Sequence, residues 1–323
     1  MNSKLSNDIK AEAKNLGFFA CGIAKAEPVA ESVANRLKEW LEKGENADMA
    51  YMSNYTDKRI DPRLLMPGLK SIVSVALNYA PSQTLPEGEY QFAAYALGLD
   101  YHDIVKEKLR ALAEKFGFED ELHSINPNAH HCRIFVDSGP VLERYWAEQA
   151  GLGWTGKNHQ LIIPKAGSMF FLGELFLDVE LEYDSPMKNR CGNCHNCIDA
   201  CPTQAINETI SASNERIEAL FDAERCLSYQ LIENRKHLSE EASMKMGDTI
   251  YGCDRCQQAC PWNRFATPNT TPELQPKEEL LGMTKEKWQN LTEEEYRKLF
   301  KGSAVKRAKY TGLMRNINAA KKK

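Results

Sequence analysis

Eight of the ten cysteines lie between positions 191 and 260, in two closely spaced groups. The first group has the spacing Cys-x2-Cys-x2-Cys-x3-Cys-Pro and occupies residues 191–202. The second has the spacing Cys-x2-Cys-x3-Cys-Pro over residues 253–261, and Cys226 precedes it. Thiolates at these spacings are typical ligands of [4Fe–4S] clusters. The two groups therefore predict a pair of iron–sulfur clusters and one-electron chemistry.

The spacing also predicts which cysteines share a cluster. In two-cluster ferredoxins the fourth cysteine of such a run ligates the other cluster. By that rule one ligand set is Cys191, Cys194, Cys197 and Cys260, and the other is Cys201, Cys226, Cys253 and Cys256. Two structural zinc sites with four cysteines each are the alternative. Zinc ribbons normally use paired Cys-x2-Cys motifs without the third cysteine and the following proline, so the spacing favours iron–sulfur clusters.

The charge of the chain is unevenly distributed. Residues 301–323 hold eight basic side chains and no acidic one, whereas the formal net charge of the whole chain is −4. The remainder therefore carries −12. A basic tail on an acidic body predicts contact with a polyanion, although a solvated helix would have the same composition.

Length and composition exclude several classes of protein. With 323 residues, 42% apolar and 27% charged, the chain has the composition of a globular protein of about two domains. No apolar run reaches the roughly 18 residues of a membrane span, and the N-terminus lacks the apolar core of a signal peptide. We therefore expect a cytoplasmic protein, with no membrane partner and no need to be more than a monomer. Cysteines at this density then indicate metal binding rather than disulfides, while the isolated Cys21 and Cys132 are expected to be inert.

A glycine-rich loop follows a predicted helix. Gly151, Gly153 and Gly156 have the spacing G-x-G-x-x-G, which is typical of dinucleotide binding when the loop follows a first strand. Here the loop follows a helix, and no acidic residue ends a second strand about 20 residues later. The pattern favours close approach of the backbone to another large cofactor.

Three polar residues of the N-terminal half each allow two interpretations. Asp137 follows an apolar strand, where it could be a general acid facing a cavity or the N-terminal cap of a helix. His102 begins a predicted helix, where a lone histidine is more often a surface or capping group than a ligand. Arg59 could bind a carboxylate or amide of a ligand, or belong to a solvated run of charges.

Helices and strands alternate over residues 1–185. Apolar periodicity predicts helices over 3–16, 29–43, 101–116 and 141–150, and strands over 71–78, 132–136 and 169–177. This alternation indicates an α/β or α+β domain large enough to bury a cofactor. Residues 186–265 form the cysteine module, and residues 266–323 begin with a linker rich in proline and threonine and end in helices.

Together these motifs resemble those of epoxyqueuosine reductases. The resemblance rests on VDSGPVLER at residues 136–144, GWTGKN at 153–158, the two cysteine groups, and GSAVKRAK at 302–309. It covers nearly the whole chain. The fold that it implies is α+β: a cobalamin-binding α/β domain like that of nitroreductases and reductive dehalogenases at 1–185, a ferredoxin-like two-[4Fe–4S] module at 186–265, and a short helical extension at 266–323. We expect no further helical-repeat domain of the kind that some family members carry.

The resemblance also implies an activity. Family members reduce the epoxide of epoxyqueuosine to the alkene of queuosine at the wobble position of tRNA, the last step of queuosine synthesis. Their cofactors are two [4Fe–4S] clusters and a cobalamin, here expected as cob(II)alamin at rest without a protein histidine on cobalt. We expect electrons to come from a low-potential donor that the sequence does not identify.

Individual roles follow from residues that match the family's motifs. Asp137 matches the proton donor. Residues that match stretches lining the cobalamin, or that follow Cys226 as plausible further contacts, are Arg59, Tyr101, His102, Asp137, Gly156, Lys157, Asn158, Leu161, Ser228 and Gln230. In the basic tail, Lys306, Arg307 and Lys309 are the best candidates for contacts with tRNA phosphates.

Two other functions stay open on the sequence alone. A corrinoid reductase of a small molecule, such as an organohalide, would share the cofactors but would have no use for the basic tail. A two-cluster electron carrier, or a nucleic-acid-binding iron–sulfur protein without chemistry of its own, would not need the large N-terminal domain. Retention of cobalt separates the second of these from the others.

Overall fold

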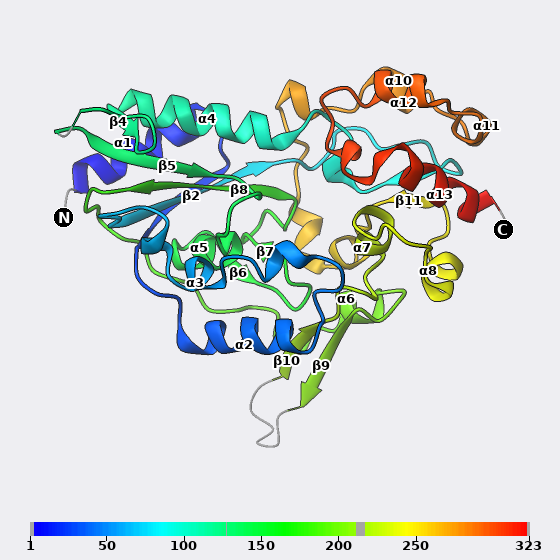
Figure 1. Cartoon of the computed structure of the whole chain (residues 1–323), viewed down its shortest axis with the longest axis horizontal. Coiled ribbons are helices and arrows are strands. Elements are labelled where there is room, and N and C mark those ends of the chain that lie inside the picture. The colour runs from blue at the N-terminus through cyan, green and yellow to red at the C-terminus, as the bar shows by residue number, and fades with distance from the viewer. Residues whose placement is uncertain (1–2, 127, 211–216, 322–323) are drawn as a thin grey trace.

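A five-stranded sheet organises one end of the molecule, the left half of Figure 1. The structure is a computed structural model and describes residues 3–126, 128–210 and 217–321. The strand order is β1-β2-β8-β5-β4, and every neighbouring pair is antiparallel except β4 and β5. The strands are β1 (Ala20–Lys25), β2 (Ser71–Asn78), β4 (Phe118–Asp120), β5 (His130–Phe135) and β8 (Phe170–Leu177). The central β2 and β8 are almost entirely buried, as their apolar sequences require.

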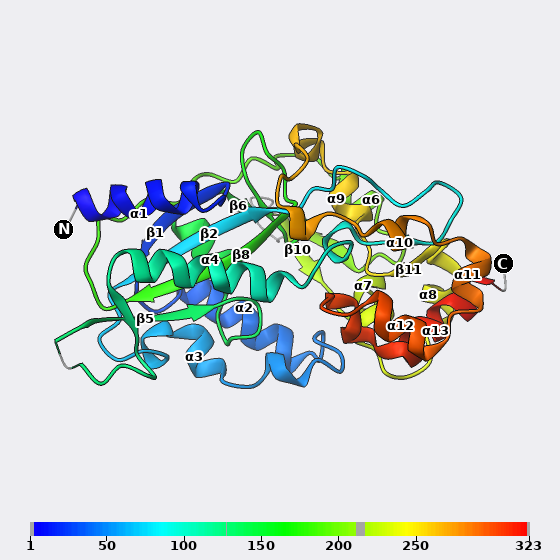
Figure 2. The same ribbon diagram turned by 90° about the horizontal axis from the view of Figure 1, so that it is seen from above.

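Helices cover both faces of this sheet (Figures 1 and 2). One face packs against α1 (Ser3–Asn15) and α4 (Tyr101–Lys115) around buried residues such as Leu109 and Leu175. The other face packs against α2 (Glu31–Glu42) and α5 (Glu143–Gln149) around Trp146 and Phe176. The short helix α3 (Thr56–Ile60) and the hairpin of β6 (Trp154–Thr155) and β7 (Leu161–Ile162) lie on this second side (Figure 1). The sheet therefore separates two apolar cores.

The cysteine module and the C-terminal helices lie at the other end of the molecule (Figure 1). The module contains α6 (Asn196–Asp199), β9 (Ile206–Ile210), β10 (Ile217–Phe221), α7 (Leu227–Ile232), α8 (Glu240–Lys245), β11 (Thr249–Tyr251) and α9 (Arg255–Gln258). The C-terminal helices are α10 (Glu278–Leu281), α11 (Lys285–Gln289), α12 (Glu293–Leu299) and α13 (Lys309–Lys321). A third core, with fully buried Trp288, holds these helices on α7 and β11.

Packing crosses the boundaries predicted at residues 185 and 265. The segment from Leu85 to Leu97 precedes both boundaries, yet it packs into the third core, where β3 (Gln91–Phe92) pairs in parallel with β11. In the opposite direction, Leu274 packs into the core beneath α1 and α4. The three-domain division stays a prediction, and the apolar contacts join its parts into one body.

Most of the predicted helices and strands are present with bounds within about three residues of those expected. Strand β1 was not predicted, because its sequence ACGIAK is short and lacks clear alternation. Among the helices of residues 3–126, 128–210 and 217–321, none is long and apolar enough to cross a membrane.

Candidate active site

The structure brings the eight cysteines together in the two predicted sets. The thiols of Cys191, Cys194 and Cys260 are electrostatic neighbours of Cys197. The thiols of Cys201, Cys226 and Cys253 are likewise neighbours of Cys256. The packing of α6 on α9 contributes to this arrangement. Cys197 lies in α6 and Cys201 follows it, while Cys256 lies in α9 and Cys260 follows it, so each helix with the residues after it supplies one cysteine to each set. In the described part of the chain, no three His, Cys, Asp or Glu side chains lie close enough together to share a single metal ion.

Backbone amides point at several of these sulfur atoms. The sulfur of Cys201 accepts a hydrogen bond from Ala205 N at 3.3 Å. Burial raises the pKa of Cys226 to about 11, although amides of Ser228 and Tyr229 that donate to its sulfur counteract the shift. Burial raises the pKa of Cys260 in the same way, against amides that follow it. Donors of this kind stabilise thiolate and tune the potential of an iron–sulfur cluster, so the local backbone suits thiolate ligands.

The two sets differ in their distance from the rest of the site. Cys191 and Cys194 alternate with exposed residues, so their set lies near the surface. The thiol of Cys256, from the other set, is an electrostatic neighbour of Tyr79, and Tyr79 in turn neighbours Arg144. Arg144 also interacts with Asp137. The first set is therefore the outer one, and electrostatic contacts through Tyr79 and Arg144 connect the second, inner set to Asp137.

Asp137 lies two residues after the end of β5. Its φ of 56° is in the left-handed region, which aspartate tolerates better than most residues. Helix α5 begins only at Glu143, and its N-cap position is Leu142, which makes no side-chain cap. The interpretation of Asp137 as a helix cap is therefore wrong, and its carboxylate, 58% exposed, is available for other contacts.

Two side chains from the start of α4 bind this carboxylate. Tyr101 donates its hydroxyl to Asp137 Oδ2 at 2.8 Å, and His102 Nε2 lies 3.2 Å from the same oxygen. The other ring nitrogen, Nδ1, is 2.6 Å from Asp100 Oδ1. Asp100 also caps α4 by accepting from the backbone amide of His102, which fixes the direction of the ring. Both ring nitrogens of His102 are therefore engaged by carboxylates.

These contacts decide where a proton resides. Hydrogen bonds to Asp100 and Asp137 raise the pKa of His102 to about 9. Burial raises the pKa of Asp137, but hydrogen bonds from His102 and Tyr101 outweigh it and hold the pKa below its usual value. At neutral pH the pair is an imidazolium beside a carboxylate.

Two further carboxyl groups lie behind Asp137, and the sequence did not single them out. Glu143 accepts a hydrogen bond from the backbone amide of Asp137. Burial and the Asp137 carboxylate raise its pKa to about 8. Glu174 on β8 is fully buried, and burial followed by Glu143 raises its pKa well above the usual value. Glu174 is the only charged residue in β8, and that was the available signal.

Arg59 and Arg307 approach the same region from different parts of the chain. Arg59 is buried and donates to the backbone carbonyl of Tyr51 at 3.0 Å, while its Nε has no hydrogen-bond partner among the described residues. The guanidinium of Arg307 lies over the Tyr51 ring, 5.7 Å from its centroid, and interacts electrostatically with Asp137. The predicted acid, one predicted cofactor contact and one predicted tRNA contact are therefore brought together.

The glycine-rich loop has a structural explanation. A Cβ atom at Gly153 would lie 2.1 Å from the carbonyl oxygen of Ile162, and one at Gly156 would lie 2.5 Å from the Ile162 side chain. These glycines let the loop fold against β7. Lys157 forms an ion pair with Glu208 of β9 at 2.7 Å, which attaches the loop to the cysteine module.

The other end of this loop presents unpartnered polar atoms. Asn158 is buried, and its Nδ2 has no hydrogen-bond partner in the described part of the chain. The same is true of His159 Nε2, whose pKa burial lowers to about 4. Leu161 is buried in β7 beside them. The sequence predicted Asn158 and Leu161 but missed His159.

The two predicted contacts after Cys226 differ. Ser228 is half-buried at the start of α7, where its amide faces the Cys226 sulfur. Gln230 is buried, and its side chain donates to Glu224 O at 2.7 Å and accepts from Asn234 at 2.8 Å. The amide of Gln230 thus serves the protein's own packing.

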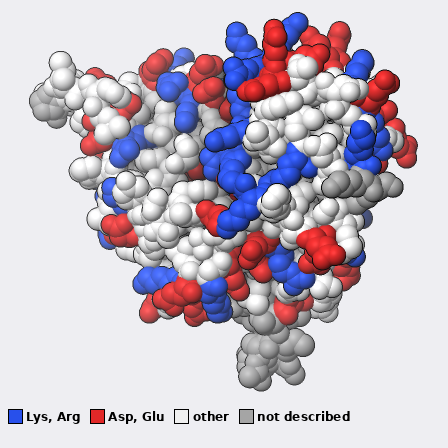
Figure 3. All heavy atoms as spheres, turned by 45° about the vertical axis from the view of Figure 1, so that its right-hand side comes forward, with Lys and Arg blue, Asp and Glu red and all other residues white. Residues whose placement is uncertain are grey.

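The basic tail separates into structural and exposed residues. Arg315 donates to three backbone carbonyls of residues 230–236, and Arg307 binds Glu233 through two hydrogen bonds of 2.7 Å. Lys306 and Lys309 are exposed, and no ion pair to either appears among the described residues. Figure 3 shows Lys and Arg side chains gathered in a band on the face that includes this end of the molecule.

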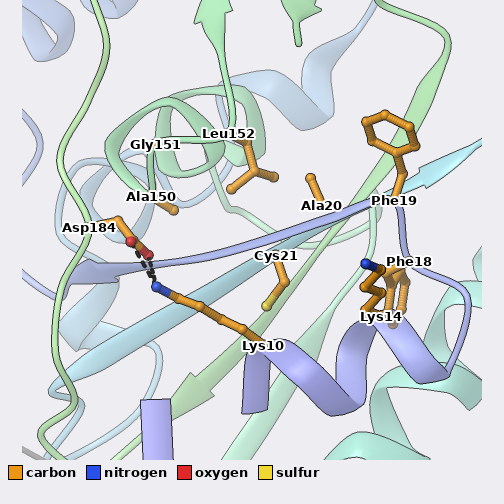
Figure 4. A pocket seen from close by; sticks show the side chains of 10 residues that line it. All are labelled: Lys10, Lys14, Phe18, Phe19, Ala20, Cys21, Ala150, Gly151, Leu152 and Asp184. Atoms are coloured by element: carbon orange, nitrogen blue, oxygen red, sulfur yellow. Dashed lines mark hydrogen bonds and ion pairs between the residues drawn. The ribbon is translucent and has the colours of Figure 1, made fainter. Parts of the chain in front are cut away.

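A separate hollow lies between α1 and the edge strand β1 (Figure 4). Lys10 and Asp184 form an ion pair of 2.7 Å at its wall, and Cys21 lines it. Burial raises the pKa of Cys21 to about 12, and burial raises that of Cys132 to about 12 as well, so both thiols stay protonated. This hollow contains none of the predicted site residues.

Two family models match the chain. Residues 59–138 match the model described as epoxyqueuosine reductase QueG, DUF1730. Residues 190–263 match the 4Fe-4S double cluster binding domain. The first match ends just after Asp137, and the second contains all eight clustered cysteines.

Curated relatives match over almost the whole chain. The epoxyqueuosine reductase of Cellulophaga algicola is 44% identical over 318 residues, which are 98% of each chain. That of Pseudomonas aeruginosa is 39% identical and covers 98% of this chain and 84% of its own.

Solved structures agree with these relatives. A crystal structure of epoxyqueuosine reductase with an epoxyqueuosine-modified tRNA-Tyr stem loop matches with a TM-score of 0.85 and 29% identity, over 98% of this chain and 80% of that one. An epoxyqueuosine reductase from Bacillus subtilis, with its catalytic loop swung out of the active site, matches with a TM-score of 0.82 and 28% identity, over 98% and 81%. A catabolic reductive dehalogenase, with a TM-score of 0.50 and 17% identity over 85% and 33%, shares the fold alone. These matches confirm the predicted fold class and family: the chain belongs to the epoxyqueuosine reductases.

Proposed function

We propose that this protein reduces the epoxide of epoxyqueuosine in tRNA to the alkene of queuosine, using two [4Fe–4S] clusters and a cobalamin. Removal of the epoxide oxygen as water consumes two electrons and two protons. The observation that carries the proposal is the placement of two sets of four thiols beside an Asp137 site that holds a proton on His102. Membership of the family supplies the substrate class.

The thiol sets fit the two clusters. Each has four sulfur donors, and backbone amides face sulfur atoms in both sets. The proposed ligands of the outer cluster are Cys191, Cys194, Cys197 and Cys260, and those of the inner cluster are Cys201, Cys226, Cys253 and Cys256. When bound, the clusters supply one-electron transfer between the surface and the Asp137 site.

The residues around Asp137 also fit a cobalamin. Buried nitrogen atoms of Arg59, Asn158 and His159 have no hydrogen-bond partner in the portion of the chain described, and the amide side chains of a corrin, which both donate and accept, would satisfy them. We propose these residues as contacts, with Tyr101, His102, Gly156, Lys157, Leu161, Ser228 and Gln230 as lining. When bound, the corrin supplies a strongly reducing cobalt centre. His102 is not proposed as a cobalt ligand, because carboxylates engage both of its ring nitrogens.

Asp137 passes a proton to the departing oxygen in this proposal. As a carboxylate, Asp137 first has to receive that proton, and His102 holds one 3.2 Å away. Asp100 fixes the ring and favours its charged form. Tyr101 orients the carboxylate through the same oxygen. In this arrangement Asp137 is the general acid, and His102, one hydrogen bond away, supplies its proton.

The C-terminal tail is the proposed tRNA contact. Lys306 and Lys309 are free to reach phosphates, whereas Arg307 is held by Glu233 and reaches towards Asp137. Lys306 and Lys309 therefore act in phosphate binding, and Arg307 positions the substrate at the site. We further propose a cytoplasmic monomer that receives electrons from a low-potential carrier.

Anaerobic reconstitution with cobalamin tests this function. Two cubanes and one corrin predict about eight iron, eight sulfide and one cobalt per chain. Reduced enzyme should then convert an RNA stem loop bearing epoxyqueuosine to one bearing queuosine, detected by mass spectrometry of the nucleosides. Full iron without cobalt would favour an electron carrier, and turnover of an organohalide but not of the RNA would favour a small-molecule reductase.

A further inference from the structure

A buried acid lies inside the central sheet without a partner. Glu174 is fully buried on β8, and neither of its carboxyl oxygens has a hydrogen-bond partner within the described residues. Ser74 stands directly opposite on β2, is also fully buried, and its hydroxyl likewise lacks a partner there. A carboxylate buried without a partner is strongly disfavoured, because it loses its hydration and gains no compensating contact. Glu174 therefore carries a proton.

This buried acid reaches the Asp137 site through Glu143. Glu174 and Glu143 interact electrostatically, and Glu143 is hydrogen-bonded to the backbone amide of Asp137. Glu143 also occupies the first turn of α5, whose next buried residue, Trp146, covers the same face of the sheet. The three carboxyl groups thus form a series from the interior of the sheet to the exposed Asp137.

The charged and titratable groups around this series come from several elements. Glu143 interacts with Asp137, with Arg144 on its own helix, and with His102 of α4. Arg59 of α3 and Tyr101 of α4 also interact with Glu143. Glu174 faces only Glu143 among the charged groups that shift it. Anionic Asp137 raises the proton affinity of Glu143, and anionic Glu143 would raise that of Glu174, so the pair binds protons in series.

We propose that Glu143 and Glu174 form an internal proton store that delivers the second proton of the reaction to Asp137. The inference rests on the proposed epoxide reduction. Two carbon–oxygen bonds break, two electrons enter the substrate, and the oxygen leaves as water with two protons. The first proton comes from His102 through Asp137, and the second from Glu143 through Asp137. Glu174 then shares its proton with Glu143, so that the two carboxyl groups hold one proton between them until solvent returns the second after turnover. Neither glutamate touches the substrate, so both are positioning residues.

The first test measures the protons without turnover. In the holoenzyme, infrared difference spectra between wild type and Glu174→Gln should show a protonated-carboxyl C=O band, at neutral pH, that is present only in wild type and shifts in D2O. Glu143→Gln should remove a second such band. Glu39→Gln is the matched control, because Glu39 is an exposed carboxyl on α2, distant in sequence from both glutamates. This substitution should remove no such band. If wild type has no such band at neutral pH, the store does not exist.

The second test is the pH profile of a single turnover with reduced holoenzyme and epoxyqueuosine RNA. We expect Glu174→Gln and Glu143→Gln to slow the reaction roughly tenfold at low pH, less than the 10²–10⁴-fold effect of a general acid that contacts substrate. The ratio of wild-type to variant rate should fall towards one as pH rises through about 8, where Glu143 loses its proton in wild type.

Each result has a distinct meaning. A ratio that is the same at every pH would show that the glutamates act only on structure and would overturn the store. If Glu174→Gln does not fold, Glu143→Gln at the half-buried end of the series carries the test alone. If wild type shows both bands but does not reduce the RNA, the proposed function fails while the protonated pair stands.

Discussion

Replacement of Asp100 by asparagine should lower the proton affinity of His102. The hydrogen bond from His102 Nδ1 to Asp100 is the largest contribution to the raised pKa of His102, followed by that to Asp137. Asparagine removes the charge but can still cap α4, because its side-chain oxygen accepts from the same backbone amide. The variant therefore changes the electrostatics of the ring with little change in the helix.

The raised pKa of His102 sets the size of the change expected in Asp100→Asn. A rise from 6.5 to about 9 corresponds to about 3 kcal/mol of preference for the charged ring, at about 1.4 kcal/mol per unit. The side chain of His102 is 28% exposed, so solvent screens the interaction of the charged ring with Asp100 only in part. We expect Asp100→Asn to lower the pKa by at least about one unit, a tenfold change in the ratio of charged to neutral ring.

The pH dependence of the free energy of unfolding measures the pKa shift of His102 in a second way. A group whose pKa is raised by folding contributes its full stabilisation below the unfolded pKa and loses it as pH rises through the folded one. For His102 that window is 6.5 to about 9. In wild type the free energy of unfolding should fall across this window, and in Asp100→Asn it should fall by about 1.4 kcal/mol less.

Histidine NMR titration and urea unfolding at several pH values measure these two quantities. Asp120→Asn is the matched control, because Asp120 pairs with His123 at 3.1 Å in an exposed loop apart from the site. It should leave the titration of His102 unchanged. An identical His102 titration in wild type and Asp100→Asn would refute the relay on which the proposed mechanism depends.

Three further outcomes are expected. Asp137→Ala should retain iron and cobalt but slow single turnover by about 10²-fold or more, and loss of cobalt would instead make Asp137 a binding residue. Cys260→Ser and Cys256→Ser should each reduce the iron content from about eight to about four per chain. Because the two cysteines belong to different sets, the variants should keep different clusters and show different electron paramagnetic resonance signals. Identical residual signals would contradict the two sets. The double variant Lys306→Ala with Lys309→Ala should reduce the slope of log affinity for tRNA against log salt concentration by about 1.4–1.8, the value for two phosphate contacts. Lys38→Ala on α2 is the control and should leave this slope unchanged. An unchanged slope in the double variant would show that the tail does not bind tRNA.

The sequence was most informative where chemistry is local. The cysteine sets followed from spacing alone, because the ligation pattern of such runs constrains the chain covalently, and the structure places the thiols in those sets. Strand β2 was predicted at its observed bounds, since the centre of SIVSVALN is mostly apolar and contains three β-branched residues.

The sequence was least informative where groups meet through the fold. Glu143 and Glu174 are 31 positions apart and become neighbours only when α5 packs on the sheet. The contacts that require glycine at positions 153 and 156 are with Ile162, and they exist only in the folded hairpin. Formal charge in the tail did not reveal that Arg307 and Arg315 bind the protein itself.

The proposed ligand sets have a consequence for how the protein is made. Each set draws on both ends of the module, since Cys191, Cys194 and Cys197 require Cys260, and Cys201 and Cys226 require Cys253 and Cys256. Neither cluster can be completed until the ribosome has released the segment around residue 260. Neither cluster can therefore be inserted before most of the chain has been made, and a nascent chain that stops before Cys253 can complete neither cubane.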